Sequence, residues 1–187
     1  SMGIFDDEMN AERLRSEQEE ARKEEAAVAA ERAVQLTYER DTELVVEFAQ
    51  TMRRRGVLPE ISTWPTVRKT TFKGRRVLGR KVAIQGWLIT APLVRITGTG
   101  AQPARPGLHI SADATALVGV AKTAETTSPF ATSSFGCGYR WEPLSIDHYR
   151  SAYLADWVDY VNRRANSKWF VSNWIESSLL EYVRHLP

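Results

Sequence analysis

Cys137, the single cysteine of this 187-residue chain, is the residue whose chemistry first suggests catalysis. It lies in the run Phe135-Gly-Cys-Gly, where the flanking glycines would let a substrate approach the thiol. A cysteine nucleophile needs a base within hydrogen-bond reach and a third group that orients the base. The candidate bases and orienting carboxylates are His109, His148, Asp113 and Asp147. Because Asp147 and His148 are sequence neighbours that cannot easily face each other, we rank a cysteine-dependent enzyme third among the functional interpretations.

The basic segment 53–81 is a denser feature. Its cations are Arg53, Arg54, Arg55, Arg68, Lys69, Lys73, Arg75, Arg76, Arg80 and Lys81. Trp64, Phe72 and Trp87 lie among or close to them. Cations neutralise phosphates and aromatic faces stack on bases, so this segment is typical of a surface that binds single-stranded nucleic acid. The chain contains no recognised nucleic-acid-binding motif, and we rank this interpretation second. Anionic lipid headgroups are a weaker alternative, because no amphipathic basic helix accompanies the segment.

Charge is strongly segregated along the chain, although the net charge is only +2. Residues 1–50 carry 6 Lys/Arg and 14 Asp/Glu, whereas residues 51–110 carry 12 Lys/Arg and one Glu. Glu39, Glu43 and Glu47 stand four residues apart in the acidic part, where like charges repel unless cations face them. Pairing within the chain or between subunits is therefore an alternative role for the basic segment.

Other recognisable sites are missing from the sequence. Gly98-Thr99-Gly100 lacks the third glycine of a dinucleotide site, and Pro103 and Pro106 exclude the helix that would have to follow. There is no phosphate-binding loop, no His-Glu-x-x-His motif and no cysteine pair for zinc. We expect no cofactor and no metal. No apolar run is long enough to span a membrane, and the N-terminus is acidic, unlike that of a signal peptide. We therefore expect a cytoplasmic protein.

The element that should position these residues is a long helix from Asp6 to Arg55, a stretch without Gly or Pro that Gly56 follows. Its inner half has an apolar stripe at helical spacing, so Val45 and Phe48 should be buried. The outer half is mostly charged. Its apolar residues include a thin heptad seam: Leu14, Ala21 and Val28. We therefore divide the chain into a projecting acidic helical extension, 1–33, and a single α+β domain, 34–187.

Strand patterns follow the helix. Residues 67–72 are an expected edge strand, and residues 81–90, apolar on both faces, an expected central strand. Shorter strands are expected over 93–97, 108–111 and 116–122. We expect turns at Leu58-Pro59 and Trp64-Pro65, a loop over 98–107 and a flap over 123–138.

Two C-terminal helices complete the predicted fold. Ser145 can cap the first, and Asn173 with Glu176 resembles a capping box for the second. Residues 168–172 fit either helix or strand. The predicted fold is α+β: a long N-terminal helix, a meandering, mainly antiparallel sheet, and two C-terminal helices packed on it. Our first functional interpretation is a non-enzymatic assembly protein that self-associates or docks a partner through its N-terminal helix.

Overall fold

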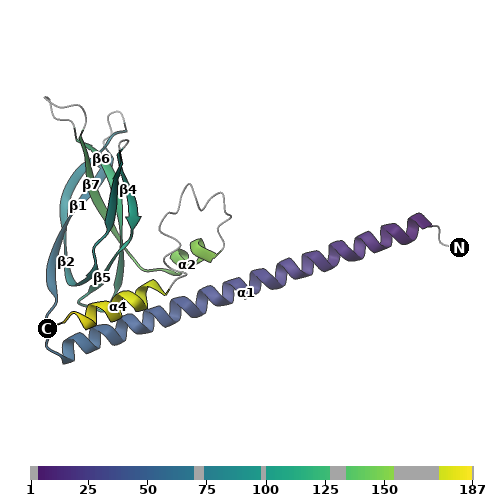
Figure 1. Ribbon diagram of the computed structural model, residues 1–187, viewed down its shortest axis with the longest axis horizontal. Coiled ribbons are helices and arrows are strands. Elements are labelled where there is room, and N and C mark those ends of the chain that lie inside the picture. Colours follow the sequence, from purple (N-terminus) through teal and green to yellow (C-terminus); the bar gives the residue numbers. More distant parts are fainter. Residues whose placement is uncertain (1–3, 70–73, 98–99, 127–133, 154–172, 187) are drawn as a thin grey trace.

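The structure is a computed structural model, and it describes residues 4–69, 74–97, 100–126, 134–153 and 173–186 (Figure 1). It confirms the predicted α+β fold. A long N-terminal helix, α1 (Ile4–Arg54), runs under one end of a curled antiparallel sheet and extends far beyond it. Two short helices near the C-terminus, α2 (Ile146–Tyr153) and α4 (Trp174–Arg184), lie against α1.

The main sheet contains five antiparallel strands in the order β1-β2-β5-β6-β7. Their bounds are β1 (Glu60–Lys69), β2 (Arg76–Thr90), β5 (Gly107–Ser111), β6 (Ala116–Thr126) and β7 (Ser134–Pro143). Strands that are consecutive in the chain pair directly, apart from one excursion between β2 and β5. That excursion is a separate two-stranded hairpin of β3 (Leu93–Thr97) and β4 (Gly100–Arg105). The expected central strand, 81–90, is part of β2, but it is central only in part: residues up to Gly86 pair with β1, residues from Gly86 to Thr90 pair with β5, and Gly86 alone pairs with both.

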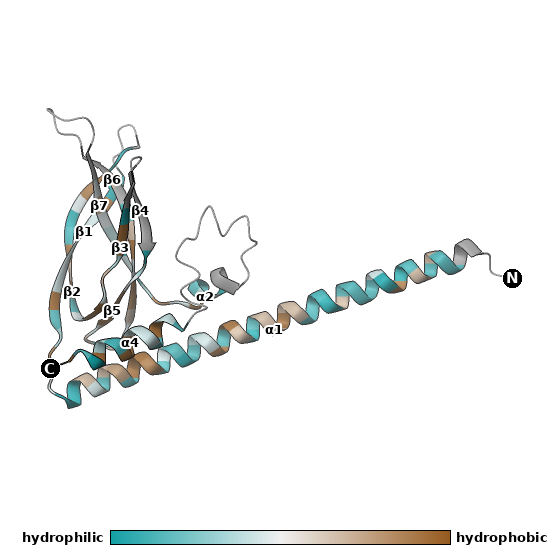
Figure 2. Cartoon of the chain, viewed as in Figure 1, coloured by the Kyte–Doolittle hydropathy of each residue, from teal (hydrophilic) through white to brown (hydrophobic). Residues whose placement is uncertain are grey.

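The core lies where the inner half of α1 and helix α4 meet one face of the sheet. Val45 and Phe48 are buried, as predicted. The Phe48 ring meets Trp87 of β2 edge-on at 6.1 Å and Tyr182 of α4 at 5.6 Å. Apolar colour is concentrated along the C-terminal part of α1, where it passes α4 (Figure 2). Burial of this stripe is the main force that fixes α1 on the domain.

Three loop and turn predictions are wrong. Most of the expected loop 98–107 is β4, in which Pro103 pairs with Val94. The expected flap 123–138 contains the end of β6 and the start of β7, which pair from Thr123↔Cys137 to Thr126↔Ser134. Trp64-Pro65 continues β1 rather than turning the chain. Proline is tolerated there because β1 is an edge strand with a register shift between Pro65 and Val67.

The C-terminal helices differ in detail from the prediction. Asn173 precedes α4 but has a left-handed backbone, and its side chain makes no capping hydrogen bond. Its side-chain oxygen instead accepts a hydrogen bond from Arg40 of α1 at 3.0 Å, so a tertiary contact replaces the expected capping box. The first helix is described only as far as Tyr153. The second half of that expected helix and residues 168–172 lie outside the described residues.

Candidate functional site

The outer part of α1 is a long surface that packs on nothing else within the described structure. Every residue from 7 to 29 is exposed, and Figure 1 shows this part projecting away from the sheet. The expected seam is on this surface: Leu14 is 53% exposed and Val28 65%. Met9, at 71%, adds a third large apolar side chain. Ion pairs such as Lys23–Glu19 (2.9 Å) stabilise the helix locally, each by only a few tenths of a kcal/mol.

A buried polar cluster holds α1 to the domain. The Asp41 carboxylate, 2% exposed, accepts a hydrogen bond from the hydroxyl of Tyr149 in α2 at 2.7 Å and from Arg40 at 2.8 Å. Arg40 also reaches Asn173, so one group of side chains connects α1, α2 and the start of α4. Burial, and then the negative charge of Asp41, raises the pKa of Tyr149, so the phenol keeps its proton.

Sequence reasoning missed this cluster, although the sequence contains a signal for it. Asp41 occupies a position on the apolar stripe of α1, between Tyr38 and Val45. A carboxylate among core positions indicates a buried partner, because an unpaired buried charge is very costly. A second contact lies nearer the start of the buried region, where Arg150 of α2 pairs with Glu31 at 2.7 Å. Together the two contacts fix the place where α1 leaves the domain.

The basic segment is divided by the fold. Arg53, Arg54 and Arg55 lie at the C-terminal end of α1, where Arg53 donates a hydrogen bond to the carbonyl of Ala112. The other described cations lie on the part of the β1–β2 hairpin that is remote from α1. Lys69 pairs with Arg76 there, in the last pair of the register. The first half of β1, which carries no Lys or Arg, lies between the two groups and spans about 17 Å from Glu60 to Pro65 at 3.3 Å per residue. Lys73 lies outside the described residues. The segment is therefore two separate basic surfaces.

The hairpin keeps its cations exposed but not the expected aromatic platform. Arg68, Lys69, Arg76, Arg80 and Lys81 are exposed. Trp87 is only 2% exposed in the core, and Trp64 packs on Tyr139 and Trp141 of β7 with ring centroids 5.1 Å apart in each pair. Phe72 lies outside the described residues. The two described tryptophans thus serve packing rather than base stacking.

The acidic residues of the inner helix do not face the basic segment. Glu39, Glu43 and Glu47 are exposed, and the hydrogen bond recorded for Glu39 comes from Gln35 of the same helix. Among the described residues, no ion pair connects these three glutamates with β1 or β2. Pairing of these charges within one chain is therefore absent from the described structure, whereas pairing between chains stays a prediction.

The residues of the proposed cysteine site are not brought together. Cys137 pairs with Thr123 on β6, whereas His109 pairs with Leu117 on the same strand. These positions are six residues apart, or about 20 Å along the strand. Burial raises the pKa of the Cys137 thiol, which disfavours the reactive thiolate. His148 contacts Ser145 and lies 3.5 Å from Glu142. The Asp113 carboxylate accepts a hydrogen bond from Ser111, and this bond is the main cause of its lowered pKa.

His109 has a different position from the one the catalytic hypothesis required. Its side chain is fully buried in β5, and neither ring nitrogen has a hydrogen-bond partner among the described residues. Burial lowers its pKa to about 4, so the imidazole is neutral at physiological pH. The ring lies edge-on to Trp141 at 5.9 Å. In the described structure, the His109 side chain therefore serves to pack against Trp141.

Two further site classes receive no support within the described ranges. No group of three or more His, Cys, Asp or Glu side chains there is arranged to hold a metal ion. No described helix is both long and apolar enough to cross a membrane. Comparison of the whole chain with protein-family models, with curated proteins and with solved structures finds no significant match.

Proposed function

We propose that this chain is a non-enzymatic assembly protein that associates through the outer part of α1. The observation that carries the proposal is the continuation of α1 as an exposed helix for about 40 Å beyond its buried part. This extension carries Leu14 and Val28 on a heptad-spaced seam with Ala21 between them. The proposal places the assembly in a reducing, cytoplasmic compartment, with which a single cysteine accords.

The physical reason is the apolar surface left in water. Full burial of a leucine or valine side chain stabilises a complex by about 1.5–3 kcal/mol, so a partner along the seam gains from each contact. Heptad spacing favours another helix as that partner. A second copy of the chain is the simplest choice, because two-fold self-association buries the same surface on both protomers.

Charge segregation suggests how two copies could align. Residues 1–50 carry eight more acidic than basic residues, whereas the hairpin end of β1 and β2 is basic and exposed. Side-by-side acidic helices repel each other, and nearby cations from a partner's hairpin would offset that repulsion. This arrangement gives the acidic extension and the basic hairpin complementary roles within one assembly.

The first test is a deletion of residues 1–29. Because residues 7–29, the part of this segment whose burial is described, are all exposed, the remaining domain should stay folded, as circular dichroism and thermal melts would show. Light scattering at tens of micromolar should then give about twice the monomer mass for the full chain and the monomer mass for the truncated one. Monomers in both samples would contradict self-association.

A pair of single substitutions separates the seam from general helix effects. Leu14→Asp places a charge on the seam, whereas Ser16→Asp places the same charge about 200° around the helix. Leu14→Asp should weaken association at least tenfold in sedimentation equilibrium, and Ser16→Asp should change it less than twofold. Equal effects of the two substitutions would show that net charge, not the seam, controls association.

The second candidate function is binding of an anionic polymer such as nucleic acid by the β1–β2 hairpin. It is favoured by one observation: exposed cations on both paired strands, with Lys69 opposite Arg76. Because the described tryptophans are packed inside the domain, binding would rest on phosphate contacts rather than base stacking. Five such contacts predict a loss of affinity of between two and three orders of magnitude from 50 to 200 mM salt.

Fluorescence anisotropy with labelled single-stranded and duplex DNA would test this candidate. Arg76→Gln should reduce affinity and flatten the salt dependence, and Arg54→Gln, at the C-terminal end of α1, is the matched control. Affinity that does not change with salt, or that both substitutions reduce equally, would argue against the hairpin as the binding surface.

A further inference from the structure

The two edges of the curled sheet meet without forming a strand pair. β1 and β7 are the first and last strands in the sheet order, yet they are in contact with each other. Gly138 makes this contact possible, since a Cβ atom there would lie 2.2 Å from Cγ2 of Val67 and 2.8 Å from the carbonyl carbon of Thr66. The sheet thus closes on itself where β1 packs against β7. We call this line of contact the β1–β7 seam, and it is distinct from the heptad seam of α1.

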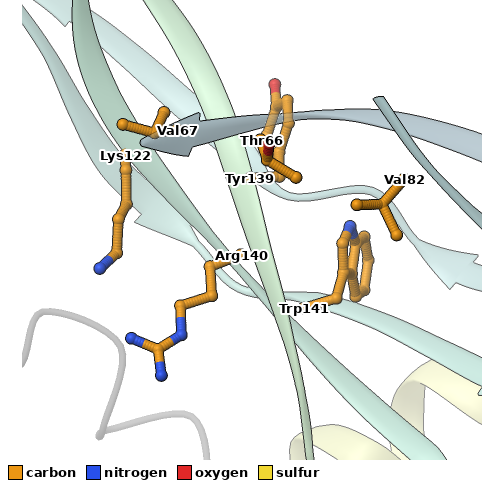
Figure 3. Close-up of a pocket in the computed structure, with 7 residues that line it drawn as sticks. All are labelled: Thr66, Val67, Val82, Lys122, Tyr139, Arg140 and Trp141. Carbon is orange, nitrogen blue, oxygen red and sulfur yellow. The ribbon is translucent and has the colours of Figure 1, made fainter. Parts of the chain in front are cut away.

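A half-open cavity of about 370 Å³ lies at this seam (Figure 3). Thr66 and Val67 of β1, Val82 of β2, and Tyr139 and Trp141 of β7 provide an apolar and aromatic lining. Lys122 of β6 and Arg140 of β7 add two cations. The volume is at the lower end of the range for small-molecule sites, and the lining combines apolar and polar groups in similar proportion.

The two cations lie on the same side of the cavity. Arg140 is opposite Val120 in the register and Lys122 is opposite Gly138, so the two are diagonal neighbours on one face of the β6–β7 pair. Figure 3 shows the Lys122 ammonium and the Arg140 guanidinium directed the same way. Arg140 has an ion pair with Glu142 at 3.3 Å, whereas no partner is recorded for the half-buried Lys122 among the described residues. An anionic group bound in the cavity would pair with Lys122 and add a second partner for Arg140.

Trp141 gives the cavity a rigid aromatic wall. Trp64, which does not line the cavity, packs behind it with ring centroids 5.1 Å apart. The six-membered ring of Trp141 packs over Gly119, where an added Cβ would lie 2.7 Å from it, so the ring is fixed in place.

We propose that the seam cavity binds a small organic anion with a planar apolar body, such as an aromatic carboxylate or sulfonate. Strand alternation puts Lys122 and Arg140 on one face of the β6–β7 pair and Tyr139 and Trp141 on the other. The ligand would therefore lie across the line where β1 meets β7, with its acid group at the two cations and its apolar body against Val67, Tyr139 and Trp141. Neither the outer part of α1 nor the basic end of the β1–β2 hairpin is needed for this binding, so the inference is independent of the proposed function.

The test uses two dyes that share an apolar body and differ in charge. 8-Anilinonaphthalene-1-sulfonate is the anionic dye, and N-phenyl-1-naphthylamine is its uncharged counterpart. Fluorescence titration of the full-length chain should give one anionic dye per chain, with the neutral dye bound at least tenfold more weakly. Equal affinity for the two dyes, or no saturable binding of the anionic dye, would overturn the proposal.

Substitutions then assign the binding to this cavity. Lys122→Gln and Arg140→Gln should each weaken binding of the anionic dye about five- to tenfold and leave binding of the neutral dye unchanged. Arg76→Gln, which removes an exposed cation outside the cavity, should change either affinity less than twofold. An unchanged affinity in both cavity variants, or an equal loss in Arg76→Gln, would place the dye elsewhere.

A further substitution tests the aromatic wall. Trp141→Phe removes the indole N–H and part of the ring, and it should weaken binding of both dyes by about threefold or more. Thermal melts show whether this variant is folded. If it is not, the two cation variants decide the matter, because their side chains lie at the rim and the core does not depend on them.

Discussion

Residues 34–54 and residues 7–29 of α1 share one helical backbone but have opposite surroundings. In the inner part, Val34, Val45, Ala49 and Met52 are buried and Asp41 is bonded to Tyr149. In the outer part every side chain is exposed. Tertiary packing stabilises the first, whereas only helix propensity and ion pairs between nearby residues stabilise the second. The comparison shows that one uninterrupted helix can contribute one part to the hydrophobic core and leave the other part exposed to solvent.

The largest effect should come from the core side of this comparison. Phe48→Ala removes a ring that is 5% exposed and that meets Trp87 and Tyr182, so it should lower the free energy of unfolding by about 3–5 kcal/mol. Leu14→Ala is the matched change in the outer part and should cost less than about 0.5 kcal/mol in the monomer. Urea denaturation at low concentration measures both. Similar losses of stability at the two sites would contradict the view that only the inner part of α1 contributes to the core.

A smaller effect concerns the pH dependence of the free energy of unfolding. It should arise from a residue buried in the domain, His109, rather than from the outer part of α1. Burial lowers the pKa of His109 to about 4, below its usual 6.5, so the unfolded chain binds the proton more readily. Its contribution to stability is therefore complete above pH 6.5 and is lost as pH falls toward 4, by about 3 kcal/mol.

The variant His109→Gln isolates this contribution, since glutamine does not titrate. The stability difference between wild type and variant should shrink by about that amount between pH 7 and pH 4, as measured by denaturant melts at each pH. A difference that stays constant over this range would show that His109 is protonated equally easily in the folded protein.

The smallest of the three effects concerns the bond between α1 and α2. Tyr149→Phe removes the hydroxyl that donates to the buried Asp41 carboxylate, and hydrogen bonds to charged groups contribute about 1.5–3 kcal/mol. We expect a loss near 2 kcal/mol in denaturant melts. Tyr38→Phe, on the neighbouring ring 5.7 Å away, is the control and should change stability by less than about 0.5 kcal/mol. Comparable losses in the two variants would mean that the Asp41 bond adds nothing specific.

Elements whose hydrogen bonds are local could be predicted from the sequence. The absence of Gly and Pro across α1, with the apolar stripe containing Val45 and Phe48, determined both the helix and the face that it buries. Each helical hydrogen bond joins residues four apart, so composition and spacing carry the needed information. The strand over 81–90 was also identified from its apolar residues, but its hydrogen bonds are to other strands, and only Gly86 of it is paired on both sides.

Only the tertiary structure decided which irregular-looking segments became strands and which distant residues met. β4 contains Pro103, and the paired end of β7 begins with Ser134, so neither resembles a strand, yet each pairs with a strand that supplies its hydrogen bonds. The same long-range pairing divided the basic segment, separated Cys137 from His109 and brought Trp64 against Trp141. A strand's partner lies outside the local sequence, so local propensity cannot specify these contacts.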